Sequence, residues 1–531
     1  MSGFTRILLF RLTLLYLLLP WGLFLLGWLR PVWAWPIGLS LLLAFWLTTR
    51  AGAAAWSKLS KTEIQRTFIL GAIALFFCIV TGVGEFFPQK GDYDKHNLMF
   101  QDLIRFDAPV VYQNATYDNP ILCYYIAYYL PVAALTKLTG SLAWANEIAL
   151  IWTFSGVFLL MVWLYRLTQP VGWWGIALFW LSSGLDVPLR WYWLWQFRFG
   201  GDLGRFIQEY ALWKVMGLKF YVPPFTYLSD GLAEHQLVFQ SPLVQFQWTP
   251  HHALGGWLAT AAVLAVYRRQ YPVVALPLIC AATLLWSPFV TIGLMPLALY
   301  IGIRQRAWTL RLFWVSTAVA VLMSTVCGLY YLAHFSYQYA GWLFTAFQNL
   351  KDVSLYLLYL IVYTFLPVWL LWRLYKAYPA LPGNDAGLLA IFAVSTVAVS
   401  TFYMGKYNDF LHRTVIPAQL VLVVLLASAI GVVVQNRLRH WSVYGLVAYL
   451  LIGAYYPIRE LTSAVWAIRK PPLVDRRISR ATINFGEADV SRILRDSTAP
   501  GTDFAAQYLG RRDSFFGRYL MKKTTDPAPN P

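Results

Sequence analysis

Charged residues are scarce in this chain. Asp, Glu, Lys and Arg make up 12% of its 531 residues, whereas 59% are hydrophobic. Soluble domains carry about 25% charged residues, so this composition excludes an ordinary water-soluble protein. Apolar runs of about 20 residues, the length of a helix that crosses a bilayer, recur along most of the sequence. We therefore expect an all-α polytopic membrane protein.

Cysteines are also few, and their spacing forms no pattern. Cys78, Cys123, Cys280 and Cys327 lie in apolar segments or at their ends, which indicates packing residues rather than a disulfide framework. The H-E-x-x-H and C-x-x-C patterns typical of zinc sites are missing. No metal ligands are therefore predicted, although Mg²⁺ or Mn²⁺ stays open as a cofactor because carboxylate oxygens bind such ions.

Acidic residues are outnumbered by basic ones, which gives a formal net charge of +18. The Lys and Arg residues are spread over short loops between apolar runs, so we expect no nucleic acid partner. Basic residues in short loops are typical of the cytoplasmic side of membrane proteins, and they also suit anionic lipid head groups. Membrane lipids are therefore the first partners that we predict.

Fourteen apolar segments are candidate membrane spans. They lie at about 7–29, 31–48, 67–83, 121–138, 145–165, 171–185, 252–267, 271–285, 287–302, 312–333, 354–373, 386–403, 415–434 and 441–457. Basic loops such as 50–66 and 304–311 mark the cytoplasmic side, which places the acidic stretch 84–118 and the WTPHH stretch 248–252 outside. Three candidate spans separate these two outer stretches, although only an even number of crossings can return the chain to the same side.

One of the segments 121–138, 145–165 and 171–185 is therefore not a full crossing. Segment 171–185 is the shortest and ends in SSGLDVP, so it is the first that we doubt. The prediction is about 13 transmembrane helices within a domain over 1–457, followed by a polar, basic tail over 458–531. Span parity puts this tail outside, whereas a lost final crossing would put it in the cytoplasm. The oligomeric state is left open.

The long stretch 186–250 is rich in tryptophan, and its acidic and basic residues balance. A charged, aromatic segment that does not cross the bilayer is typical of amphipathic helices lying in the membrane surface. Such outer-face helices would either press against a lipid substrate or form a structural belt. Asp186, Glu234 and His235 are the candidate site residues of this stretch.

The acidic loop that follows the third span concentrates residue types that transfer protons. Asp92 and Asp94 flank a tyrosine and are followed at once by Lys95 and His96, while Glu85 lies at the start of the loop. Carboxylates beside a cation and an imidazole can serve as a general base or as ligands for a hard metal ion. The alternative is a solvated loop whose charges pair locally.

Two more polar clusters lie at the outer mouths of spans. His251 and His252 begin one span, and because adjacent helical residues face different directions they are not expected to share a metal ion. They would donate hydrogen bonds to a phosphate or a sugar hydroxyl, or cap an interfacial helix. The second cluster comprises Lys406, Asn408, Asp409, His412 and Arg413. Arginine suits bidentate phosphate contacts, whereas the alternative is a helix end anchored at the interface.

The stretch GDYDKHNLMFQDL (91–103), continued by APVVY and ILCYYIAYYLPVAALTKLTG, resembles the first outer loop of the type C glycosyltransferases and the span after it. These are polytopic membrane enzymes whose sugars are carried on polyprenyl phosphate or diphosphate. Shorter stretches, namely SGLD, WTPHHALGGWL, LWSPF and NDF…R…IPA, are similar to uncharacterised bacterial multi-spanning proteins of this type. The resemblance covers about residues 70–430. It departs near the N-terminus, where two spans rather than one precede the span that leads into the acidic loop.

The resemblance implies a glycosyltransferase that moves a sugar from a polyprenyl-phosphate donor to a lipid, glycan or protein acceptor. It would act at the outer face of a bacterial inner membrane. By position, Asp92 matches the essential acid of that family, and Asp94 is second. On this interpretation the substrate and phosphate ligands are Lys95, His96, His251, His252, Lys406, Asp409 and Arg413.

Three other functions stay open. A transporter or flippase for a lipid-linked or anionic substrate predicts ionisable residues within the spans, facing a cavity at the membrane midplane, and these spans hold few. A polysaccharide polymerase or ligase would use similar chemistry on the same face. A membrane scaffold without enzymatic activity would leave the acids of the loop dispensable.

Overall fold

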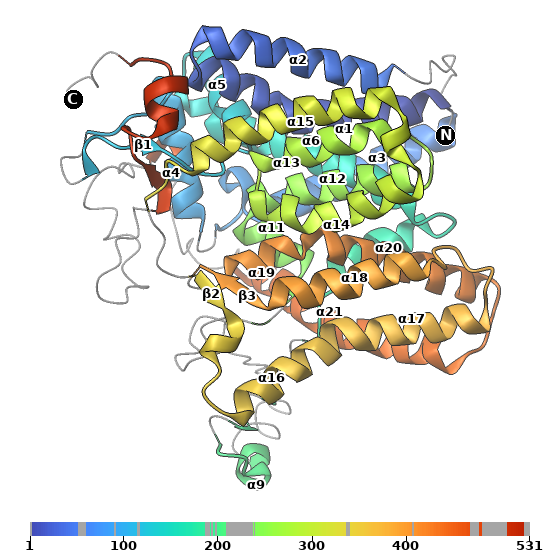
Figure 1. Cartoon of the computed structure of the whole chain (residues 1–531). Helices are drawn as coiled ribbons and strands as arrows, with labels where there is room; N and C mark the ends of the chain where they lie inside the picture. The colour runs from blue at the N-terminus through green and yellow to red at the C-terminus, as the bar shows by residue number, and fades with distance from the viewer. Residues whose placement is uncertain are drawn as a thin grey trace. The chain divides into compact units, whose positions relative to one another are not determined.

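Helices make up most of the described structure (Figure 1). The computed structural model describes residues 3–50, 60–89, 92–113, 117–185, 192, 195–196, 199–208, 237, 239–335, 340–405, 408–467, 477–480 and 507–524. The chain forms two compact units. Unit 1 comprises Met1–Leu167, Gln245–Tyr337 and Ser463–Pro531, and unit 2 comprises Thr168–Val244 and Gln338–Thr462. Each unit is described by itself.

Eight helices in the described residues are long and apolar enough to cross a membrane. They are α1 (Gly3–Trp28), α2 (Pro31–Thr49), α3 (Lys61–Val80), α6 (Ala145–Leu167), α15 (Arg311–Tyr331), the run of α16 (Leu350–Leu360) into α17 (Leu366–Ala377), α20 (Ile416–Gln435) and α21 (Trp441–Ala467). Five shorter apolar helices are α5 (Leu130–Thr139), α7 (Gly172–Leu181), α13 (Leu276–Leu284), α14 (Pro288–Arg304) and α18 (Ala386–Ser400). The predicted class, an all-α membrane protein, is confirmed.

Helix α12 (Pro250–Tyr267) is the buried centre of unit 1. Every residue from Pro250 to Val266 is buried, as expected of a helix that lies inside a bundle. Gly255 lets Trp286 come close, since a Cβ at this glycine would lie 2.8 Å from the Trp286 side chain. The Trp286 indole donates a hydrogen bond to the Leu17 carbonyl of α1 (3.1 Å). This packing holds the first turn of α12, which carries the two histidines, inside unit 1.

The segment 121–138 forms no long helix. Its first residues form strand β1 (Ile121–Leu122), and its only helix, α5, is long enough for about half of a bilayer. The next helix, α6, begins beside the turn that follows α3, because a Cβ added to Gly84 would lie 2.5 Å from the Asn146 carbonyl oxygen. Helix α7 of segment 171–185 has the same length as α5, so which of these segments is not a full crossing stays a prediction. The close approach at Gly84 favours 121–138.

The end of the tail is built into unit 1. Strand β4 (Leu509–Gly510) pairs antiparallel with β1, and a π-helical turn (Phe516–Leu520) follows it. The Arg30 N–H, just after α1, donates a hydrogen bond to the Leu520 carbonyl (2.9 Å), and the Arg511 N–H donates to the Ala333 carbonyl (2.7 Å). These two partners lie just after the ends of α1 and α15.

In unit 2 the predicted site residues Asn408, Asp409 and Arg413 lie between a strand pair and a long helix. Strands β2 (Ala340–Trp342) and β3 (Phe402–Met404) are antiparallel, and α19 (Asp409–Thr414) leads into α20. Of the predicted interfacial stretch 186–250, the described helices are α9 (Leu203–Phe206) and α11 (Pro242–Trp248). Most of the remainder lies outside the described residues.

Candidate functional site

The acidic loop presents one carboxylate at the start of helix α4 (Tyr93–Arg105). Asp92 precedes this helix, and its side chain makes no capping hydrogen bond. Instead it forms an ion pair with Lys95, in which Nζ lies 2.7 Å from Oδ2. The Asp92 side chain is 34% exposed and the Lys95 side chain only 10%. The local charge pairing expected as the alternative is present, and it leaves the carboxylate as the accessible member of the pair.

His96 joins α4 to two other parts of unit 1. Its Nε2 lies 3.0 Å from the Trp248 carbonyl at the end of α11, and its Nδ1 lies 2.6 Å from the Tyr129 hydroxyl. A carbonyl only accepts, so Nε2 carries the proton and donates it. In the neutral ring Nδ1 then accepts from Tyr129. The buried imidazole therefore links the acidic loop to the start of α12 through the chain at Trp248.

Tyr129, the partner of His96, keeps its proton. Burial raises the pKa of Tyr129 well above its ordinary value, and the nearby groups of Tyr124, Tyr128 and Asp92 raise it further. A phenol under these conditions serves as a hydrogen-bond donor and not as a base.

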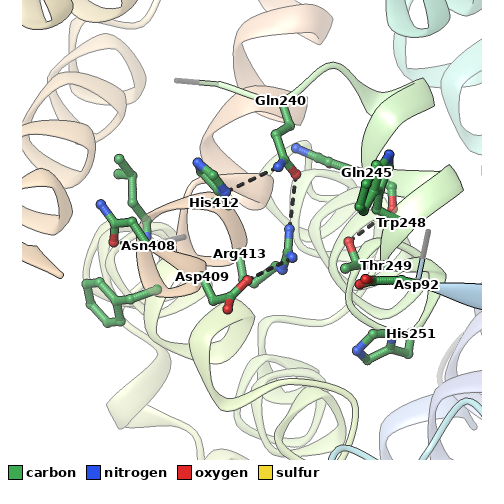
Figure 2. A network of polar contacts seen from close by, with 12 residues as sticks. Asp92, Gln240, Gln245, Trp248, Thr249, His251, Asn408, Asp409, His412 and Arg413 are labelled. Atoms are coloured by element: carbon green, nitrogen blue, oxygen red, sulfur yellow. Dashed lines mark hydrogen bonds and ion pairs between the residues drawn. The ribbon is translucent and has the colours of Figure 1, made fainter. Parts of the chain in front are cut away.

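Two histidines of α12 lie beside His96 and Tyr129 and form one cluster with them. The rings of His251 and His252 are 4.0 Å apart, and the His251 ring lies 5.2 Å from that of His96. The Tyr124 hydroxyl is 3.4 Å from His251 Nε2, and the Tyr125 ring is 4.9 Å from His252. In Figure 2 Asp92 is drawn between His251 and Thr249, the residue before α12. Two motifs that are distant in the sequence, DYDKH and WTPHH, thus meet in unit 1.

The other acids of the loop are placed differently. Glu85 forms an ion pair with Arg477 of the tail, with Nε 3.2 Å from Oε2. Asp94 lies in the first turn of α4, and its side chain is half-buried. Asp92 is therefore the acid best placed for chemistry at the cluster.

Unit 2 holds a separate polar cluster around Arg413. Arg413 is buried, with only 6% of the residue exposed. Its Nη2 lies 3.0 Å from Asp409 Oδ1. Its Nη1 donates to Gln240 Oε1 (3.1 Å). Figure 2 shows Gln240 between His412 and Arg413. Because its guanidinium is already oriented by two partners, Arg413 is a preorganised cation.

Gln240 fixes the neighbouring histidine as well. Its Nε2 lies 3.2 Å from His412 Nδ1, so the amide donates and this ring nitrogen accepts. The Gln240 carbonyl accepts from the Gln419 amide (3.3 Å). Asn408 caps α19 by accepting from the Leu411 N–H (3.3 Å), at a backbone φ of 54°. Asn408 therefore has a structural role at the start of α19.

Sequence reasoning missed Tyr124, Tyr129 and Gln240. The tyrosines stand in the run ILCYYIAYYL, whose four tyrosines in an apolar stretch are a signal of buried hydroxyls. Gln240 stands in the apolar run LVFQSPLV, where an uncharged amide is the polar exception. Four predicted candidates lie outside the described residues, namely Asp186, Glu234, His235 and Lys406.

Within the described stretches, no group of three or more His, Cys, Asp or Glu residues is placed to hold a metal ion. Comparisons of the chain with protein-family models, with curated proteins and with solved structures find no match. What the chain does must therefore be inferred from the clusters themselves.

Proposed function

We propose that the chain is a membrane glycosyltransferase of the type C kind. It transfers a sugar from a polyprenyl-phosphate donor to a lipid, glycan or protein acceptor at the outer face of a bacterial inner membrane. The observation that carries the proposal is the partly exposed Asp92 carboxylate, held by Lys95 at the edge of a buried cluster of histidines and tyrosines.

In the proposed reaction Asp92 acts as the general base. Its carboxylate takes the proton of an acceptor hydroxyl, and the hydroxyl oxygen attacks the anomeric carbon of the donor sugar. The bond from that carbon to the phosphate oxygen breaks, and polyprenyl phosphate leaves with the bonding electrons. Lys95 orients the carboxylate, and His251 and His252 line the site where the substrate's hydroxyl or phosphate oxygens bind. His96 holds α4 against the start of α12. A divalent metal is not required by any of these steps.

A second part of the proposal concerns unit 2. Lys406, Asp409 and Arg413 are assigned to phosphate binding, with Arg413 as the main contact. Its Nε makes no hydrogen bond to the described residues, so one donor of the guanidinium is left for an anionic oxygen. A preorganised guanidinium suits the charged oxygens of a phosphate group.

The proposed membrane topology has 13 crossings. The eight long helices, α12 and the four short apolar helices other than α5 supply that number. Alternation through them puts the basic loops near 50–66, 268–269, 304–311, 373–376 and 437–439 on one side. The acidic loop falls on the opposite side, which is the face where the lipid-linked donor would be presented.

The test compares cells that lack the protein after complementation with wild type or with Asp92→Asn at equal membrane abundance. We expect the variant to behave like the null strain, because a general base contributes about 10²–10⁴-fold to rate. Mass spectrometry of polyprenyl-linked sugars and surface glycans would show one lipid-linked sugar accumulating and one glycan losing a residue.

The matched control is Asp107→Asn, an exposed acid of the same loop, which should restore every profile. If Asp92→Asn also restores every profile, Asp92 is not the base, and transport of a lipid-linked substrate becomes the better explanation.

A further inference from the structure

The C-terminal segment Gln507–Thr524 is interleaved with unit 1 through its backbone. The Cys123 N–H donates to the Tyr508 carbonyl (2.8 Å), the Phe335 N–H to Leu509 (3.3 Å), and the Lys522 N–H to Trp28 (2.8 Å). Each of these hydrogen bonds joins the segment to a different part of the chain. The segment is therefore part of the fold of unit 1.

The side chains of this segment are core residues. Tyr508, Leu509, Phe516 and Met521 are buried. The Phe516 ring lies 5.3 Å from that of Tyr330, the residue that also fixes the chain at the cluster. Full burial of each large apolar side chain is worth about 1.5–3 kcal/mol. The docking of this segment is thus supported by packing as well as by hydrogen bonds.

One residue of the segment reaches the candidate site. The Tyr508 ring lies 4.7 Å from the Tyr124 ring, at an interplanar angle of 54°. Tyr124 is held at its backbone, where its N–H donates to the Tyr330 hydroxyl (2.9 Å). At its other end the Tyr124 hydroxyl contacts His251 Nε2 (3.4 Å). Tyr508 therefore packs against the ring that stands between the segment and His251.

We propose that Tyr508 is a positioning residue of the candidate site, which sets the Tyr124 ring and, through its hydroxyl, the hydrogen bonding of His251. The proposal rests on the proposed function only for its effect on activity. Its structural content, the path from Tyr508 through Tyr124 to His251, holds whatever reaction the site performs.

The experiment records the imidazole ¹⁵N signals of histidine-labelled protein in lipid nanodiscs, with His251 assigned from a His251→Gln variant. Tyr508→Leu should move the His251 signals and leave those of His412 and His440 in unit 2 unchanged, whereas Tyr508→Phe, which keeps the ring, should match wild type. Tyr519→Leu is the matched control, because this tyrosine of the same segment is 55% exposed.

Tyr124→Phe removes only the hydroxyl that contacts His251 and should move the same signals. The double variant Tyr124→Phe/Tyr508→Leu should show no further change, since the two residues act in series. Additive changes, or unchanged His251 signals in Tyr508→Leu, would overturn the proposal. If Tyr508→Leu does not fold, Tyr508→Met, which is smaller in its effect on packing, is measured against the same criteria.

A transfer assay with a lipid-linked donor gives the second readout. Tyr508→Leu should lower kcat by on the order of tenfold to a hundredfold with little change in KM, because it misplaces a group without removing a ligand. Tyr508→Phe should restore the rate. If wild type shows no transfer, the proposed function fails while the ¹⁵N result still decides the role of Tyr508.

Discussion

The buried imidazole of His96 uses both of its nitrogens within unit 1. One donates to the Trp248 carbonyl, and the other accepts from Tyr129. Since no ring nitrogen is left over, its contribution to substrate binding would be to hold α4 and the start of α12 in register. The hydrogen bond to the Trp248 carbonyl joins the helix that follows Asp92 to the chain that leads into His251.

Tyr129→Phe tests this arrangement. The substitution keeps the ring and removes the donor to His96 Nδ1, which leaves a buried acceptor without its partner at a cost of about 1–3 kcal/mol. We expect a lower thermal unfolding midpoint for the variant in detergent. Tyr519→Phe, whose hydroxyl belongs to an exposed side chain, should unfold at the wild-type temperature. Equal midpoints for Tyr129→Phe and wild type would show that the hydrogen bond to His96 is not stabilising.

At the scale of single residues, the sequence predicted contacts between neighbours along the chain and missed contacts between distant residues. Asp92, Lys95 and His96 are close in sequence, so their grouping could be inferred from spacing along one helix. Tyr124, Tyr129 and Gln240 could not be assigned, because their partners His251, His96 and His412 lie far along the chain. Only the fold brings such pairs together.

The docked strand pair β1–β4 contains a titratable group at its border. His334 forms a backbone bridge with Gly510, and burial lowers the pKa of His334 to about 4, opposed by a hydrogen bond to the Cys123 backbone. In the undocked chain the same histidine binds a proton below about pH 6.5. The contribution of neutral His334 to the free energy of docking is therefore fully present above pH 6.5. Up to about 3 kcal/mol of it is lost as pH falls from 6.5 to 4.

Hydrogen exchange of the segment Gln507–Thr524 at pH 7.5 and pH 4.5, corrected for intrinsic rates, measures this effect. We expect weaker protection at pH 4.5 in wild type and a smaller pH dependence in His334→Gln, whose side chain does not titrate. Identical pH profiles for the two proteins would exclude His334 as the group responsible.

Some secondary-structure elements could be predicted from the sequence and others could not, and the reason is physical. Long apolar helices such as α1, α6 and α20 follow from hydropathy alone, because length and composition decide whether a helix can cross a bilayer. The segment 121–138 has the same composition, yet strand pairing with β4 takes up its first residues and leaves a ten-residue helix. Composition carries no sign of a strand partner located in the distant tail.

At the scale of the whole molecule, the contacts of the C-terminal segment predict the side of the membrane on which it lies. The segment Gln507–Thr524 contacts residues that follow α1 and α15 and lie beside β1, so it should share the side of the acidic loop. A single cysteine at Asp513, an exposed position, should react in spheroplasts with a membrane-impermeant maleimide.

A cysteine at Arg437 is the matched control, because this exposed residue stands in a basic loop and should react only after permeabilisation. The reverse labelling would refute both the outer tail and the 13-crossing topology. The native Cys78, Cys123 and Cys327 are buried and Cys280 is half-buried, so their background reaction should be small.

The pairing of β1 with β4 has a consequence for the order in which the protein is made. Helices of unit 1 depend on local contacts and can form while the chain is still being synthesised. Strand β1 is translated early, but its partner β4 appears only after the last long helix, α21, has been made. Until then Tyr124 lacks its neighbour Tyr508. Biogenesis therefore finishes at the site, and a nascent or truncated chain would carry every acid and histidine of the cluster in an unassembled state.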